Sequence, residues 1–159
     1  MLRSLIAIFV SLQGLVANAA ELDASPCVGD QLSVPLARER TGHVSVKLKI
    51  NGAEARVLVD TGANVNTLDV EQGQKLGPKV VPLPESAPVE GRATMTVAIG
   101  PRVLGLQEFS VMDLHFINIP SKRYGTEPFV GQLGAQFFTD FKARIDFKNM
   151  VLCLSPPMS

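Results

Sequence analysis

The sequence has no excess of charge of either sign. Its 15 lysines and arginines are matched by 15 aspartates and glutamates, which gives a formal net charge of zero at pH 7. Nucleic acids and other polyanions are held by clusters of basic residues that release counterions on binding. The composition therefore gives no indication of a nucleic-acid partner.

Residues that bind metals are equally scarce. The chain has two histidines, His43 and His115, and two cysteines, Cys27 and Cys153. None of the four stands at the short spacing that a zinc site requires, and we expect neither a metal nor another cofactor. Two cysteines suffice for one disulfide. The sequence leaves open whether they form it, within one chain or between two, or remain buried thiols.

Long apolar runs are also missing. Near the start, the apolar run over residues 5–12 is too short to cross a bilayer. It follows Arg3 and precedes Ala17-Asn18-Ala19, an arrangement typical of a signal peptide cleaved after Ala19. The alternative is an uncleaved N-terminal membrane anchor. We expect a signal peptide over residues 1–19 and an exported protein, periplasmic or secreted, with no stable membrane span.

Cleavage after Ala19 leaves 159 − 19 = 140 residues, enough for one domain with a real core. We expect this domain over residues 42–155, where strand patterns begin. Residues 20–41 are expected to form an N-terminal leader or extension, and removal of this segment in a self-processing precursor remains open.

Short stretches of alternating apolar and polar residues run through the domain. Residues 43–50 alternate without interruption, and Asn51-Gly52 then predicts a two-residue hairpin turn into a strand over 54–59. Asn and Gly favour this turn because both tolerate positive φ. Further strands are expected over residues 93–99, 102–112, 129–133, 143–147 and 150–154.

Helical patterns are few. Residues 69–76 and 135–141 each predict a short helix, while residues 114–128 are interpreted as an irregular surface loop. There is no alternation of strands with helices of the kind that builds a parallel sheet. The sequence therefore predicts an all-β domain with a closed, barrel-like sheet and one or two short helices.

One carboxylate stands directly after an apolar strand. Val57-Leu58-Val59 leads into Asp60-Thr61-Gly62-Ala63, and the chain then returns to apolar residues. An ordinary turn, in which the Asp60 side chain accepts local backbone N–H groups, explains the glycine. It does not explain why both flanks are apolar.

The segment from Val57 to Ala63 resembles the active-site signature of the retropepsin-like aspartic proteases, the single-lobe relatives of the pepsins. A second segment, Gln132-Leu133-Gly134-Ala135-Gln136-Phe137-Phe138, resembles the element and following helix that support the active-site loop in this family. The resemblance extends from about residue 42 to residue 154. It implies the closed β fold of the family and an aspartic endopeptidase that cleaves peptides or proteins.

The resemblance also implies a role for each matching residue. Asp60 is the catalytic carboxylate, Thr61 bonds to the opposite loop, and the Gly62 amide donates to the carboxylate. Ala63 lines the cleft, whereas Leu133 and Gly134 pack behind the loop, where a side chain at position 134 would collide with it. The expected flap is a hairpin tip that closes over substrate, and Gly91, in Glu90-Gly91-Arg92, is its candidate residue.

The expected chemistry needs two carboxyl groups. One, ionised, draws a proton from water as the water attacks the peptide carbonyl, and the other, protonated, polarises that carbonyl. Two close carboxyls share one proton because both cannot ionise cheaply. The chain has only one Asp-Thr-Gly segment and no Asp-Ser-Gly. The partner is therefore expected to be Asp60 of a second copy, in a homodimer with two-fold symmetry.

Two departures from the family pattern, together with a poor flap candidate, favour an alternative. Gln132 stands where relatives carry an aliphatic residue, Gln136 is longer than the usual residue at its position, and the flap candidate has a single glycine. The alternative is a non-catalytic module that keeps the fold and binds peptides or assembles with other chains. Cleavage specificity and pH optimum are not indicated by the sequence.

Overall fold

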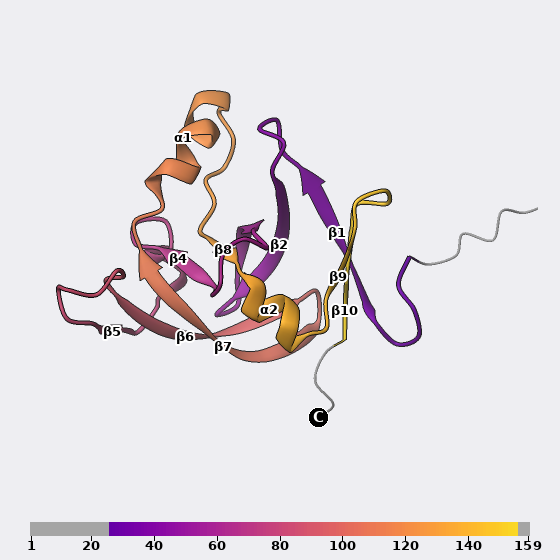
Figure 1. Ribbon diagram of the computed structural model, residues 1–159, viewed down its shortest axis with the longest axis horizontal. Coiled ribbons are helices and arrows are strands. Elements are labelled where there is room, and N and C mark those ends of the chain that lie inside the picture. Colours follow the sequence, from indigo (N-terminus) through magenta and orange to yellow (C-terminus); the bar gives the residue numbers. More distant parts are fainter. Residues whose placement is uncertain (1–25, 156–159) are drawn as a thin grey trace, which may run out of the picture.

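Ten strands join in one sheet, and seven of them lie where the sequence predicted strands (Figure 1). The computed structural model describes residues 26–155, so the expected signal peptide lies outside the described residues. The helices are α1 (His115–Tyr124), α2 (Ala135–Asp140) and the short 3₁₀ helix η1 (Gln74–Leu76). The strands are β1 (Leu32–Arg38), β2 (Val44–Ile50), β3 (Ala53–Val59), β4 (Thr67–Asp69), β5 (Val80–Pro82), β6 (Gly91–Ile99), β7 (Arg102–Met112), β8 (Gly131–Leu133), β9 (Arg144–Asp146) and β10 (Val151–Leu154).

Six of the strands close into a barrel. They follow the order β6-β7-β4-β8-β3-β2, and β2 then pairs with β6 through Lys49 opposite Ala98 and Ile50 opposite Val97. The prediction of an all-β domain with a closed, barrel-like sheet and one or two short helices is confirmed. Closure of the ring removes the unpaired edges that these strands would otherwise expose.

The barrel interior is filled by the apolar residues of each alternation. On β2, Val46, Leu48 and Ile50 are buried while Lys47 and Lys49 are exposed, as a strand with one face on a core requires. The Asn51-Gly52 turn has φ angles of 49° and 84°, which only residues tolerant of the left-handed region adopt readily. The predicted hairpin from β2 to β3 is therefore formed.

The first described strand, β1, lies in the range 20–41, for which the sequence predicted a leader or extension. It pairs with β10 through residues 32–35 and with β2 through residues 36–38. Just beyond it, Glu39 forms an ion pair with Arg56 of β3, 2.5 Å between nitrogen and oxygen. These contacts make residues 32–39 part of the sheet, so the sheet begins before the expected boundary at residue 42.

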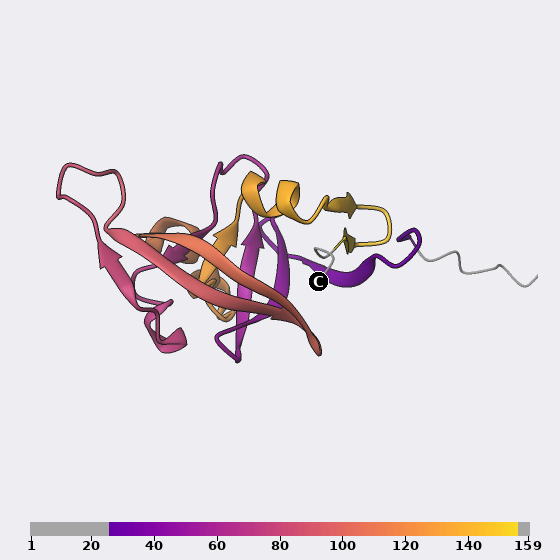
Figure 2. The ribbon, with the colours of Figure 1, turned by 90° about the horizontal axis from the view of Figure 1, so that it is seen from below.

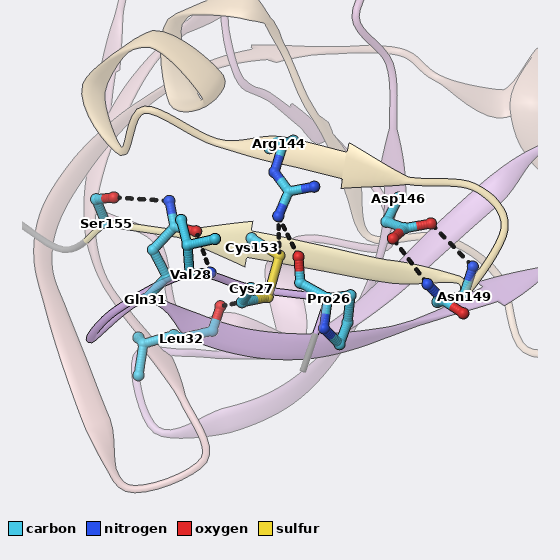
Figure 3. Close-up of a disulfide and its surroundings, with 10 residues drawn as sticks. All are labelled: Pro26, Cys27, Val28, Gln31, Leu32, Arg144, Asp146, Asn149, Cys153 and Ser155. Carbon is cyan, nitrogen blue, oxygen red and sulfur yellow. Dashed lines mark hydrogen bonds between the residues drawn. A yellow bond between two sulfur atoms is a disulfide. The ribbon is translucent and has the colours of Figure 1, made fainter. Parts of the chain in front are cut away.

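A disulfide joins the two ends of the described chain (Figure 3). The sulfurs of Cys27 and Cys153 are bonded within one chain, and 126 positions separate the two residues. Nearby, the Gln31 side-chain amide donates to the Ser155 hydroxyl over 3.1 Å. A crosslink over so long a loop restricts the unfolded chain strongly, and it fastens the segment before β1 to β10.

Residues 114–128 contain a helix, so the prediction of an irregular surface loop was wrong. Helix α1 holds Pro120 in its interior and ends at Gly125, whose φ of 62° is left-handed. The interior proline hides the helix from a sequence pattern, because proline ordinarily marks a helix start or a break. The helix expected over residues 69–76 is also reduced: residues 67–69 form β4, and only 74–76 form η1.

Candidate active site

Asp60 lies where two parallel strands of the barrel end. β3 pairs in parallel with β8, with Val59 opposite Leu133. The Asp60 amide continues this pairing by donating to the Leu133 carbonyl over 3.0 Å. Asp60 is half-buried. The apolar residues of β3 are thus needed to carry the strand through the interior, and the polar residue appears where the strand emerges.

A tight turn holds the Asp60 carboxylate in place. Its Oδ1 accepts the Gly62 N–H over 2.9 Å, and the Ala63 N–H donates to the Asp60 carbonyl over 3.2 Å. Among residues 26–155, no other hydrogen bond or ion pair reaches the carboxylate. A single chain therefore supplies one carboxyl here, with its second oxygen unused.

The outer side of this turn is open to solvent. Thr61, Gly62 and Asn64 are exposed, and Val65 keeps 42% of its surface accessible. The Thr61 hydroxyl has no hydrogen-bond partner in the described part of the chain. This side of the turn therefore leaves an apolar side chain and a hydroxyl group in contact with solvent.

The inner side of the turn packs against Gly134. A β-carbon added at this glycine would lie 2.2 Å from the Val65 carbonyl oxygen and 2.8 Å from that of Ala63. Immediately after it, the Ala135 amide donates to the Ala63 carbonyl over 2.7 Å. Leu133 is fully buried behind the same turn. The two sequence segments are therefore in direct contact, and only glycine fits at position 134.

Asn66 completes the support of the turn and was missed by the sequence reasoning. It is fully buried, and its Oδ1 accepts the Gly134 N–H over 3.1 Å while its backbone carbonyl accepts the Ser110 N–H over 2.9 Å. A buried amide without such partners would be costly. The only signal in the sequence was that Asn66 lies between two apolar residues, Val65 and Leu68.

The two glutamines that depart from the family pattern have different surroundings. Gln132 is 9% exposed and its backbone pairs with β3 and β4, opposite Leu58 and Thr67. Gln136 is exposed, and its backbone N–H donates to the Asn64 backbone carbonyl over 3.1 Å. Backbone groups make these contacts, so none of them depends on a hydrogen bond from a glutamine side chain.

Gly91 is not at a hairpin tip. It is the first residue of β6, it is buried, and it lies opposite Pro82 of β5. A β-carbon there would be 2.6 Å from the Val80 side chain. The tip of the β5–β6 hairpin is instead the connection over residues 83–90, which stands out at the upper left of Figure 2. Strand pairing set this register, which local sequence does not reveal.

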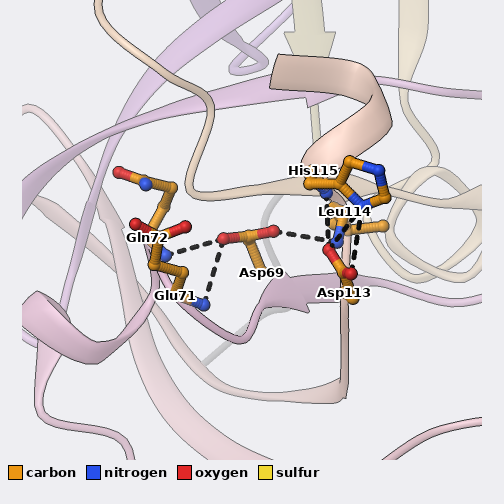
Figure 4. Close-up of polar contacts among 6 residues, drawn as sticks. All are labelled: Asp69, Glu71, Gln72, Asp113, Leu114 and His115. Atoms are coloured by element: carbon orange, nitrogen blue, oxygen red, sulfur yellow. Dashed lines mark hydrogen bonds and ion pairs between the residues drawn. The ribbon is translucent and has the colours of Figure 1, made fainter. Parts of the chain in front are cut away.

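A second aspartate, Asp69, has all its hydrogen bonds within the chain (Figure 4). It is 2% exposed; its Oδ1 accepts the Glu71 and Gln72 amides over 3.1 and 2.6 Å, and its Oδ2 accepts the Leu114 amide over 2.9 Å. These bonds join the end of β4 to the start of α1. The arrangement is structural, because no oxygen remains free for a substrate.

Asp113 and His115, beside Asp69 in Figure 4, form an exposed pair. The His115 backbone amide, and then its ring, lower the pKa of the Asp113 carboxyl below its usual value of 3.8. Within residues 26–155 there is no group of three or more potential ligands arranged to hold a metal ion. The same range contains no helix both long and apolar enough to cross a membrane.

Comparisons with known proteins agree with this geometry. The family model described as "Aspartyl protease" matches residues 46–137. A retropepsin-like aspartic protease from Rickettsia conorii is similar in structure, with 26% identity and a TM-score of 0.55, over 78% of this chain and 90% of that one. The retroviral protease-like domain of Ddi1 from Leishmania major shares the fold, with 16% identity and a TM-score of 0.52, over 73% of this chain and 92% of that one. No curated protein sequence matches the chain.

Proposed function

The chain belongs to the aspartyl protease family, and from that premise we propose that it is an exported aspartic endopeptidase whose catalytic pair is Asp60 and the Asp60 of a second copy. The observation that carries the proposal is the state of this carboxylate. It lies on an exposed turn with one hydrogen bond from Gly62 and no acidic partner among residues 26–155. A two-fold axis beside the turn would bring two such groups together.

The two carboxyls of the pair would act at the same time, one on the water and the other on the substrate. The ionised Asp60 accepts a proton from the water that attacks the peptide carbonyl, while the protonated Asp60 of the other copy donates a hydrogen bond to the carbonyl oxygen. Collapse of the tetrahedral intermediate passes a proton to the leaving nitrogen and breaks the C–N bond. The Gly62 amide, 2.9 Å from Oδ1, keeps the ionised carboxylate oriented.

Export is supported by the disulfide. The Cys27–Cys153 bond is stable in oxidising compartments, whereas the cytoplasm keeps most thiols reduced. The signal peptide expected over residues 1–19 points to the same compartments. The substrate would then be a peptide or protein outside the cytoplasm.

Inhibitor stoichiometry tests the shared site directly. The chain without residues 1–19 would be titrated in a calorimeter with a peptide inhibitor whose hydroxyl mimics the tetrahedral intermediate, and its mass measured in parallel by light scattering. We expect a dimer that binds one inhibitor molecule per two chains. One inhibitor per chain, or tight binding by a monomer, would exclude a site shared across the axis.

The connection over residues 83–90 favours a second candidate, a non-catalytic module that binds peptides or assembles with other chains. This segment carries Pro84 and Pro88 and no glycine, so it is stiffer than a flap that must open and close. A chain of this kind would remain monomeric at high concentration, would cleave no peptide and would not bind the inhibitor. The same titration therefore separates the two functions.

A further inference from the structure

A groove of about 670 Å³ runs along β1, away from the Asp60 turn. Six consecutive residues of β1, 32–37, form one wall, and the turn between β6 and β7, residues 99–102, forms the other. Because alternate residues of a strand point to opposite faces, a groove lined by six in succession follows the edge of the strand. None of residues 60–66 lines it.

The groove exists because the sheet divides at this place. β1 pairs with β2 only from Leu36 onward, while its first half, residues 32–35, turns away to pair with β10. β2 in turn meets β6 only at Lys49 and Ile50. The first half of β1 therefore has a strand on one side and an open space on the other.

The open side of β1 presents unpaired backbone groups. The Leu36 amide donates to the Met150 carbonyl over 2.8 Å, so residues 32, 34 and 36 direct their backbone groups toward β10 and its turn. By alternation, Ser33 and Pro35 direct theirs into the groove. Ser33 offers an N–H and a C=O, and Pro35 offers a C=O. An extended peptide can add to such an edge as a further strand.

The charges along the groove select the kind of peptide. Lys47 and Arg102 line it, both are exposed, and neither has an ion-pair partner among residues 26–155. Arg56 also lines it, but its charge is paired with Glu39. No acidic residue lines the groove. A segment that carries acidic side chains complements two free cations on walls that are mostly apolar.

We propose that this groove binds an extended segment of another protein, with apolar residues at alternate positions and acidic side chains, which adds as a strand to the open edge of β1. The stretch from Leu32 to Ala37 gives a length of about 20 Å, enough for roughly six residues of an extended chain. The site is independent of the Asp60 pair, so binding there does not require the chain to be a protease.

Fluorescence anisotropy with two labelled peptides tests the charge preference. Both are blocked at their ends and have the core Val-Thr-Val-Thr; one is flanked by glutamates and the other by lysines. The protein is the chain without residues 1–19 carrying Asp60→Asn, so that cleavage plays no part. We expect the glutamate peptide to bind at least about tenfold more tightly than the lysine peptide. Equal affinities would overturn the proposal.

Charge reversal in the groove identifies the residues. The double variant Lys47→Glu, Arg102→Glu is expected to reverse the preference, so that the lysine peptide binds more tightly. Lys49→Glu is the matched control, because Lys49 lies on the same strand, is exposed and lies outside the groove lining. A preference that survives the double variant, or that Lys49→Glu also reverses, would refute the assignment.

Backbone methylation of the peptide tests strand addition itself. Two glutamate peptides would be N-methylated at alternate backbone amides, one at the odd-numbered positions and the other at the even-numbered positions. One of these peptides should lose its binding, and the other should keep most of it. Unchanged affinity of both peptides would contradict strand pairing.

Two other results would assign the groove to a different occupant. A fall in oligomer mass on charge reversal, without peptide binding, would assign it to a second copy. Binding that appears only after residues 156–159 are deleted would assign it to the end of the chain itself.

Discussion

Two aspartates nine positions apart, Asp60 and Asp69, have opposite surroundings. Asp69 is buried and its two oxygens accept three backbone N–H groups from its own chain. Asp60 is half-buried on an exposed turn and accepts one, from Gly62. Asp60 directly follows β3, and Asp69 is the last residue of β4, a strand of the same barrel. The two carboxylates differ in the number of hydrogen bonds that they accept from their own chain.

A carboxylate with every oxygen occupied stabilises a fold and has nothing left for a substrate. A carboxylate held by one bond, on a turn fixed from behind by Gly134 and Asn66, is oriented and still available. Orientation without full hydrogen bonding is what an acid–base group requires. The comparison therefore separates a structural aspartate from the aspartate that we propose as catalytic.

The largest expected effect is that of Asp60→Asn on activity. Asparagine keeps the shape and an acceptor for the Gly62 amide, but it cannot exchange a proton. We expect cleavage of an unfolded protein substrate to fall by more than about a thousandfold, with the free energy of unfolding changed by less than about 1 kcal/mol. Assays of purified protein, with urea unfolding alongside, measure both. Undiminished cleavage would remove Asp60 from the mechanism.

Asp69→Asn should have the opposite effect: it should lower stability and leave the activity of the folded protein unchanged. Asparagine retains one acceptor oxygen and places an NH₂ group against an amide of Glu71, Gln72 or Leu114, so a buried donor loses its partner. We expect the free energy of unfolding to fall by about 3 kcal/mol, while the protein that remains folded keeps its activity per molecule. Asp140→Asn, at the exposed end of α2, is the control. A stable but inactive Asp69→Asn protein would erase the distinction between the two aspartates.

Asn66→Ala tests how the turn is held from behind. It removes the acceptor of the Gly134 N–H, and we expect a loss of about 2 kcal/mol in the free energy of unfolding. Asn64→Ala is the matched control, because Asn64 is exposed and contributes only its backbone carbonyl, to Gln136. Under conditions where both variants are folded, Asn66→Ala should also lower kcat. Equal stabilities of the two variants would show that the buried amide contributes nothing.

The smallest expected effect concerns Asp146, a half-buried aspartate whose hydrogen-bond partners are local. Asp146 accepts the Asn149 backbone amide and side chain, which lower its pKa below 3.8. A lowered pKa in the folded state adds stability above the unfolded value, and this stability is lost as the pH falls through the folded value. The urea midpoints of wild type and Asp146→Asn should therefore differ at about pH 5 and converge toward about pH 2. A difference independent of pH would contradict this.

Local patterns predicted the parts of the fold that local interactions determine. The hairpin at Asn51-Gly52 and the burial of alternate residues on β2 depend on backbone preference and a period of two. Asp60 at a strand end could be seen for the same reason, since an apolar run that stops at a polar residue marks where a strand leaves the core.

Features set by distant partners could not be predicted in this way. The buried contacts of Asn66 and Asp69 reach residues more than forty positions away. The place of Gly91 in β6 depends on its pairing with Pro82. Helix α1 carries an interior proline, so its helical state follows from tertiary contacts rather than from its own pattern.

Activity in mixtures of wild-type and Asp60→Asn chains tests the shared catalytic pair most directly. The two proteins would be unfolded together, refolded at equal amounts and constant total concentration, and assayed for peptide cleavage. If each site needs one Asp60 from each of two chains, activity falls to about a quarter of that of pure wild type, because only wild-type pairs are active. Activity of about half would mean that each chain carries a complete site, and would contradict the account.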